Sequence, residues 1–156
     1  MPLVSVRQNW IVLLVFVALV LGIGMVVGLV AAPGTYVREL KMPDLVLPDA
    51  VSGILGLVLS VAFAIAGWRT WVIDSNSTEM RLWLATLILS WWFSPAFFIM
   101  RMPALALCIV AALFVLMVWF EFRTWRRDRP SFWLMSPSVV YIAYVAAMTA
   151  AIVAMN

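Results

Sequence analysis

Histidine is absent from this chain, and Cys108 is its only cysteine. The lack of histidine removes the commonest metal ligand and the usual proton shuttle. A single cysteine excludes an internal disulfide and a cysteine-rich zinc or iron–sulfur site, so we expect Cys108 to be a small buried hydrophobic residue. Charged residues make up only 11% of the chain, and the net charge of +3 gives no reason to expect a nucleic-acid partner.

Charged residues are also missing from five long stretches, residues 8–37, 50–68, 82–100, 102–120 and 130–156. The shortest has 19 residues. A helix of that length spans about 28 Å, close to the ~30 Å hydrocarbon core of a bilayer. A charge at the bilayer centre costs roughly 2.5–3.5 kcal/mol on insertion scales. With a mean hydropathy of +1.12, the chain is predicted to be an all-α integral membrane protein with five transmembrane helices, and the lipid bilayer is its first expected partner.

Proline, glycine and polar clusters separate these stretches. We expect a single domain over residues 1–156, with a long connection at residues 33–49. The first apolar segment exceeds the 7–15 residues of a signal-peptide core, so we expect it to be retained as a helix. The transmembrane helices are expected at about 10–32, 50–73, 80–100, 104–122 and 132–155.

The basic residues predict the orientation of the chain. Five crossings place the two ends of the chain on opposite sides of the membrane. Seven lysines and arginines fall on the N-terminal side and three on the other side. Because basic residues accumulate on the cytoplasmic side, we expect a cytoplasmic N-terminus. Arg69, one turn before a helix end, is expected to extend outward to water.

Nine tryptophans are a high number for a chain of this length. Trp91 and Trp92 are helix neighbours and point about 100° apart, so at least one should pack against protein or a ligand. Six others lie near expected helix ends, where an interfacial aromatic belt is typical of membrane proteins. These six are Trp10, Trp68, Trp71, Trp83, Trp125 and Trp133.

Four motifs occur in order along the chain. Residues 33–43 read PGTYVRELKMP, residues 66–71 read AGWRTW, residues 90–98 read SWWFSPAFF and residues 137–144 read PSVVYIAY. They resemble the PGxWYxxLxKP, AxWxxW, NxxWSPxFF and PYLxWxxF motifs of the TspO/MBR family of tryptophan-rich sensory proteins and translocator proteins. Asn156 is similar to a terminal asparagine of that family.

The resemblance implies a compact five-helix bundle of TspO/MBR type, often a homodimer, in a bacterial inner (cytoplasmic) membrane. It also implies a central pocket for a tetrapyrrole, such as a porphyrin, or a sterol-like molecule, with residues 33–49 as a lid. The tetrapyrrole would be a ligand, and no cofactor is expected. The predicted ligand-binding residues are Tyr36, Arg38, Trp68, Thr86, Ser90, Trp92, Phe93, Phe97, Tyr141 and Tyr144.

Several positions depart from the family motifs. Tyr36 and Tyr141 stand where the family has tryptophan, and Ala50 replaces the tryptophan that opens the second transmembrane helix. Thr86 and Ser90 replace a glutamine and an asparagine. The scaffold positions persist while pocket positions become smaller or less polar. The chain therefore resembles a divergent member, and its ligand is left open.

Two interpretations of the hydroxyl and small residues stay open. Thr86, Ser90 and Ser94 share one helix face at spacings of four. They either point into a cavity or bond to their own backbone, because hydroxyls often satisfy carbonyls freed by a proline such as Pro95. Gly24 and Gly28 form a GxxxG pattern that favours close helix packing, either within the bundle or at a dimer seam.

The leading hypothesis is a membrane receptor or carrier that binds a flat hydrophobic molecule, with a sensory, regulatory or transport role. Arg38 or Lys41 would meet a ligand carboxylate at the pocket mouth, or else lie in a solvated loop. One alternative is a scaffold that kept the fold without the ligand site. Another is a light-dependent porphyrin-degrading enzyme. No nucleophile–base pair is evident, so we expect no catalytic residue and no enzyme.

Overall fold

The computed structural model describes residues 6–30, 34–41, 43–44 and 47–156. Within these residues it contains helices and no strands. Five helices are long and apolar enough to cross a membrane, which confirms the predicted five-helix membrane fold. The elements are α1 (Val6–Val30), α2 (Thr35–Glu39), α3 (Asp49–Ile73), α4 (Thr78–Ser94), η1 (Pro95–Ile99), α5 (Pro103–Arg127) and α6 (Arg129–Met155).

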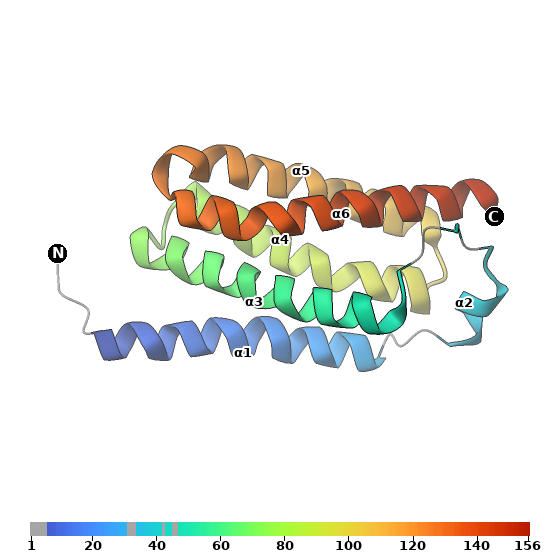
Figure 1. Ribbon diagram of the computed structural model, residues 1–156, viewed down its shortest axis with the longest axis horizontal. Helices are drawn as coiled ribbons and strands as arrows, with labels where there is room; N and C mark the ends of the chain where they lie inside the picture. The colour runs from blue at the N-terminus through green and yellow to red at the C-terminus, as the bar shows by residue number, and fades with distance from the viewer. Residues whose placement is uncertain (1–5, 31–33, 42, 45–46) are drawn as a thin grey trace.

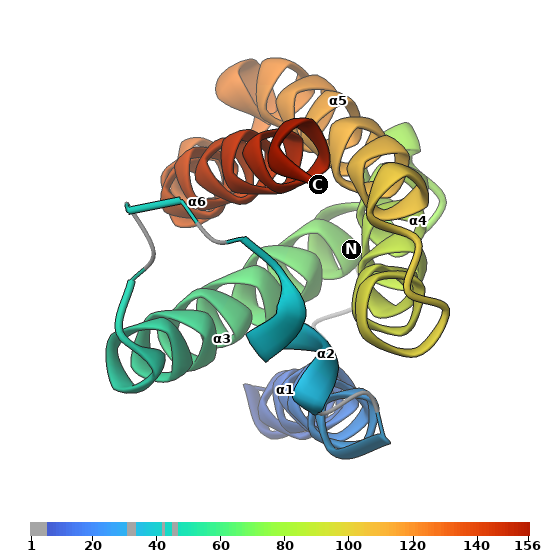
Figure 2. The ribbon, with the colours of Figure 1, turned by 90° about the vertical axis from the view of Figure 1, so that its right-hand side faces the viewer.

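The five long helices run side by side and alternate in direction, as Figure 1 shows. Viewed along the bundle, α1 lies at one edge and contacts α3 and α4, and α5 and α6 lie at the opposite edge (Figure 2). The α5–α6 and α4–α5 pairs share the largest contacts. The short helix α2 lies at the end of the bundle where α6 finishes (Figure 1).

The helix bounds differ from the prediction in three places. The connection at 33–49 contains the short helix α2, and the predicted helix end at 31–32 lies outside the described residues. The third crossing changes to a π-helix at Pro95, since a proline removes a backbone donor and the helix re-registers around it. The predicted loop at 123–131 is instead helical except at Asp128. Helices can continue beyond the hydrocarbon core, and hydropathy does not register that extension.

The core is built around Trp83, which is fully buried. Its ring stacks on Phe63 with centroids 4.9 Å apart, and its indole N–H donates to the Phe63 carbonyl at 2.9 Å. A Cβ placed on Gly67 would lie 2.2 Å from the Trp83 ring, so glycine is what lets α3 and α4 approach here. The expectation that Trp83 belongs to an interfacial belt is therefore wrong.

The positions of Cys108 and Arg69 correct two further expectations. Cys108 is exposed on α5, so it faces the surroundings of the bundle and not its core. Arg69 does not simply extend to water, because its guanidinium pairs with Asp128 at 2.8 Å. A charge near a helix end can reach a partner between two neighbouring helices as readily as it reaches the headgroups.

Candidate functional site

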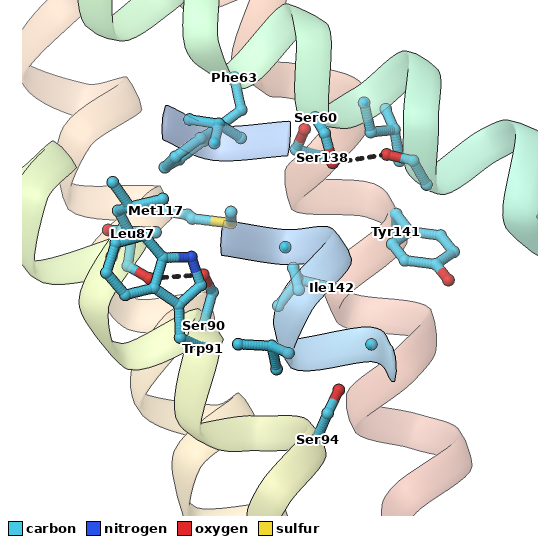
Figure 3. Close-up of a pocket in the computed structure, with 17 residues that line it drawn as sticks. Ser60, Phe63, Leu87, Ser90, Trp91, Ser94, Met117, Ser138, Tyr141 and Ile142 are labelled. Carbon is cyan, nitrogen blue, oxygen red and sulfur yellow. Dashed lines mark hydrogen bonds between the residues drawn. The ribbon is translucent and has the colours of Figure 1, made fainter. Parts of the chain in front are cut away.

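A cavity of about 270 Å³ lies between the helices. Its walls come from α1, α3, α4 and α6, with one residue from α5, and on each helix the lining positions recur at intervals of three or four residues. Figure 3 shows Trp91 and Tyr141 on opposite sides of it. The lining residues are Val20, Gly24, Val27, Gly28, Gly56, Leu59, Ser60, Phe63, Thr86, Leu87, Ser90, Trp91, Ser94, Met117, Ser138, Tyr141 and Ile142.

Three glycines leave the cavity open. Gly24 and Gly28 of α1 and Gly56 of α3 all line it. A Cβ built on any of them would have no other atom within 4 Å, apart from neighbours in the chain. The GxxxG pattern of α1 therefore borders empty space, and close packing within the bundle is not observed at these two residues. The missing side chains create room in the bundle.

The hydroxyls on the cavity wall are used in two ways. Thr86 donates to the Leu82 carbonyl at 2.7 Å and Ser90 donates to the Leu87 carbonyl at 2.6 Å. Both predicted interpretations therefore hold, because these residues line the cavity while their protons bond to their own helix. Their oxygen lone pairs are left to accept a bond from a ligand.

Ser138 of α6 differs from these hydroxyls. The residue is 5% exposed, and its Oγ has no hydrogen-bond partner among the described residues. A buried hydroxyl without a partner loses roughly 1–3 kcal/mol of solvation that nothing replaces. Because Ser138 lines the cavity, a ligand with a polar edge would supply the missing bond.

The aromatic side chains fall into two groups. Trp91 and Tyr141 line the cavity, whereas Trp92 is 59% exposed and points away from it. Tyr36, Phe93 and Phe97 form a second group at the end of the bundle near α2. There the Tyr36 and Phe97 centroids are 6.3 Å apart, and those of Phe93 and Phe97 are 6.1 Å apart.

The connection after α2 is joined to α6. The Leu47 N–H donates to the Tyr144 hydroxyl at 3.2 Å. The Asn156 side chain accepts from the Lys41 N–H at 3.2 Å and donates to the Lys41 carbonyl at 3.3 Å. The rings of Tyr144 and the cavity residue Tyr141 lie 6.1 Å apart. The loop is thus held one helical turn from the cavity wall.

The predicted site residues are therefore only partly brought together. Thr86, Ser90 and Tyr141 lie on the cavity wall. Arg38 is exposed on α2, and Trp68 is half-buried on α3 with its indole N–H unpaired among the described residues; neither lines the cavity. Sequence reasoning missed Ser60, Phe63, Trp91, Met117 and Ser138 as lining residues.

Charge is kept away from the cavity, because none of the described residues that line it is ionisable as an acid or base other than Tyr141. The ion pairs lie at the other end of the bundle. Glu79 accepts from Arg123 and from Arg127, each at 2.9 Å. The described residues contain no group of three or more metal-ligating side chains. A ligand enclosed by this cavity must therefore be uncharged over most of its surface.

Asp128 separates α5 from α6 and is 8% exposed. Its carboxylate accepts two bonds from Arg69, at 2.8 and 3.1 Å, and one from the Ser131 hydroxyl. Burial raises the pKa of Asp128, but the bonds from Arg69 and Ser131 outweigh it and leave the pKa below its usual value. The junction between the two helices is fixed by this charged contact.

Five membrane-spanning helices surround a hollow that is lined by four of them and by one residue of the fifth. The model of the TspO/MBR family matches residues 16–155. The chain belongs to the TspO/MBR family. No curated protein sequence matches it. Membership identifies an integral membrane protein and supports a receptor or carrier role, since members of this family are in general binding or transport proteins.

Proposed function

We propose that this TspO/MBR protein binds a flat hydrophobic molecule in the cavity between α1, α3, α4 and α6, as a receptor or carrier with a sensory, regulatory or transport role. The tetrapyrrole and sterol-like classes both meet the chemical requirement of a broad apolar surface with one polar edge. Trp91 and Tyr141 would contact the faces of such a ligand, and stacking on aromatic rings needs no charge.

The observation that carries this proposal is the unpaired Ser138 hydroxyl on the wall of an otherwise apolar hollow. Buried polar groups in proteins nearly always have partners, so a ligand that accepts from or donates to Ser138 would complete the site. The volume of about 270 Å³ is just below the ~300–1,000 Å³ typical of ligand pockets. A tetrapyrrole would therefore extend past the glycines of α1 toward the lipid.

A scaffold without a ligand site is the second candidate, and it predicts a bundle whose centre is filled by side chains. The hollow beside Gly24, Gly28 and Gly56 favours a binding protein instead. A porphyrin-degrading enzyme is the third candidate. We expect no enzymatic activity, because the described residues that line the cavity include no acid or base other than Tyr141 and no activated nucleophile. Illumination of the protein with protoporphyrin IX should bleach the porphyrin no faster than light alone.

For its location we propose the bacterial inner membrane with a cytoplasmic N-terminus. Among the described helix ends, Arg69, Arg81, Arg123, Arg126 and Arg127 all belong to the end of the bundle where α1 begins. This is the charge distribution that the positive-inside rule associates with the cytoplasmic face. A reporter that is active only outside the cytoplasm should stay inactive when it is fused to the N-terminus. Reporter activity would show that the orientation is the opposite of the one proposed.

The binding proposal is tested by titrating the purified protein with protoporphyrin IX and following tryptophan fluorescence. Saturable quenching is expected, because Trp91 lines the cavity. Replacing Ser138 by alanine should weaken binding about five- to tenfold, the effect of one buried hydrogen bond of about 1–1.4 kcal/mol. Ser136→Ala is the matched control, since the Ser136 hydroxyl donates to the Phe132 carbonyl and does not line the cavity. Quenching that never saturates would argue against a porphyrin site.

If porphyrin fails, a fluorescent sterol is the second probe, with the same pair of variants. The polar edge of a sterol is its single hydroxyl, which can both donate to and accept from Ser138. Saturable binding that depends on Ser138 but not on Ser136 would assign the sterol-like class. Absence of saturable binding for both probes would support the scaffold.

A further inference from the structure

A second concave surface lies outside the cavity, at the end of the bundle where α5 passes into α6 (left in Figure 1). It is a groove of about 820 Å³ along the last turns of α5 and the first turn of α6. Three arginines and three aromatic residues line it, together with two glutamates. We call it the arginine groove; its basic residues are Arg123, Arg126 and Arg127.

The groove lies where the bilayer changes from acyl chains to headgroups. From Pro103 to Phe122, α5 has 20 residues without a charge except Glu121, a length of about 30 Å that matches the hydrocarbon core. The arginines follow in the next turn. The groove therefore has an apolar part that contacts acyl chains and a basic part at the level of lipid phosphates.

The aromatic residues form the apolar part. Phe122, which lines the groove, is 81% exposed. Trp125 packs edge-on against Phe132 with ring centroids 4.7 Å apart, and the Arg129 guanidinium lies 5.3 Å from the centre of the Trp125 ring. Trp125 is thus held between an aromatic ring and a cation, which gives the groove a fixed wall.

The arginines retain donors for a ligand. Arg123 uses Nε and Arg127 uses Nη1 to bind the buried carboxylate of Glu79, and a guanidinium has five N–H donors in all. Arg126 is exposed and forms no ion pair with any described residue. With three arginines against Glu79 and Glu121, the groove carries a net positive charge.

We propose that the arginine groove binds the headgroup of an anionic phospholipid, with its phosphate on Arg126 and the free donors of Arg123 and Arg127, and an acyl chain along Phe122 and Phe132. Arginine is suited to this task, because its planar donor array matches phosphate oxygens. Basic pockets between transmembrane helices bind such headgroups by the same electrostatics. The site is independent of the central cavity and does not require the binding proposed there.

The test uses the full chain, delipidated in detergent, and native mass spectrometry of bound lipid. Phosphatidylglycerol and phosphatidylcholine with identical acyl chains are titrated separately. The wild-type chain should bind phosphatidylglycerol more tightly, and Arg126→Gln should weaken that binding about tenfold, as expected for one charge-assisted phosphate contact. Arg81→Gln is the matched control, because Arg81 is an exposed arginine at the same end of the bundle that does not line the groove. It should leave the affinity unchanged.

Three results would overturn the proposal. Equal affinity for phosphatidylcholine would show that the groove does not select negative charge. Equal losses in Arg126→Gln and Arg81→Gln would assign the effect to general surface charge. Displacement of phosphatidylglycerol by soluble glycerol 3-phosphate at the same concentration would identify a free-phosphate site. Unchanged thermal unfolding of Arg126→Gln confirms that the variant is folded. If Arg126→Gln does not fold, Arg126→Lys replaces it in the titrations, because lysine retains the charge and should retain part of the selectivity.

Discussion

Replacement of Gly67 by alanine should destabilise the bundle, although alanine is ordinarily the better helix residue. The new methyl group would lie 2.2 Å from Trp83 Cε2, 2.4 Å from Cζ2 and 2.6 Å from Nε1. Trp83 cannot easily move aside, because it is fully buried, stacked on Phe63 and bonded to the Phe63 carbonyl. The helices must therefore separate, or the indole must give up these contacts.

The size of the effect follows from these contacts. Overpacking a core costs typically about 1–3 kcal/mol, and loss of the indole hydrogen bond adds about 1 kcal/mol. The gain in helix propensity from glycine to alanine returns at most about 1 kcal/mol. The net loss is therefore about 1–3 kcal/mol, which corresponds to a fall in melting temperature of roughly 2–12 °C for a chain of this size.

Thermal unfolding of the purified protein in detergent measures this loss. Gly53→Ala is the matched control, because it lies on the same helix with nothing within 4 Å of its added Cβ. It should leave the melting temperature equal or slightly higher. Trp83→Phe in the Gly67→Ala background should recover part of the loss by removing the clashing ring. Equal melting of the Gly67→Ala and Gly53→Ala variants would refute this account of the contact between α3 and α4.

Three further predictions concern the ends of the bundle. Glu79→Gln should lower the free energy of unfolding by about 1–2 kcal/mol, because it leaves Arg123 and Arg127 without a charged partner while both remain partly hydrated; a variant as stable as wild type in a detergent melt would contradict this. Since the pKa of Asp128 is lowered in the folded protein, its contribution to stability should be complete above the ordinary carboxyl pKa of about 4 and be lost as the pH falls below that. Melts of wild type and Asp128→Asn from pH 7 to pH 3 should therefore converge at low pH, and a constant difference would exclude the pair with Arg69. Asn156→Ala should free the backbone of Lys41 and speed limited proteolysis in residues 33–49, whereas an unchanged cleavage rate would show that this contact does not hold the loop.

The charge-free runs were sufficient to predict the five spans, because a bilayer penalises charge so strongly that the pattern needs no tertiary information. The same signal fails at the junction of α5 and α6. There α5 continues to Arg127 and α6 begins at Arg129. These helix ends carry charges and lie beyond the expected hydrocarbon core, where the presence of charge does not distinguish a helix from a loop. It also fails at α2, whose five residues are too few to show a helical period.

The candidate site could be predicted only in part. The face that carries Thr86 and Ser90 was recognised from its spacing and does line the cavity. Trp91 lines the cavity and Trp92 does not. The sequence does not distinguish the two, because α4 is apolar on all sides and its rotation about its own axis depends on the neighbouring helices. Ser138 stands three residues before Tyr141 on the same face of α6, a spacing that could have identified it. That its hydroxyl lacks a partner depends on the other four helices.

The central claim is that the hollow between the helices is the ligand-binding site, and a pair of α1 variants tests it most directly. Gly24 lines the cavity and Gly22 does not, while both have open space around an added Cβ. Phenylalanine at position 24 should fill the hollow and abolish saturable binding of protoporphyrin IX or of the sterol probe, and phenylalanine at position 22 should leave binding as in the wild-type chain. Binding that persists in Gly24→Phe, or that is lost equally in both variants, would contradict the account.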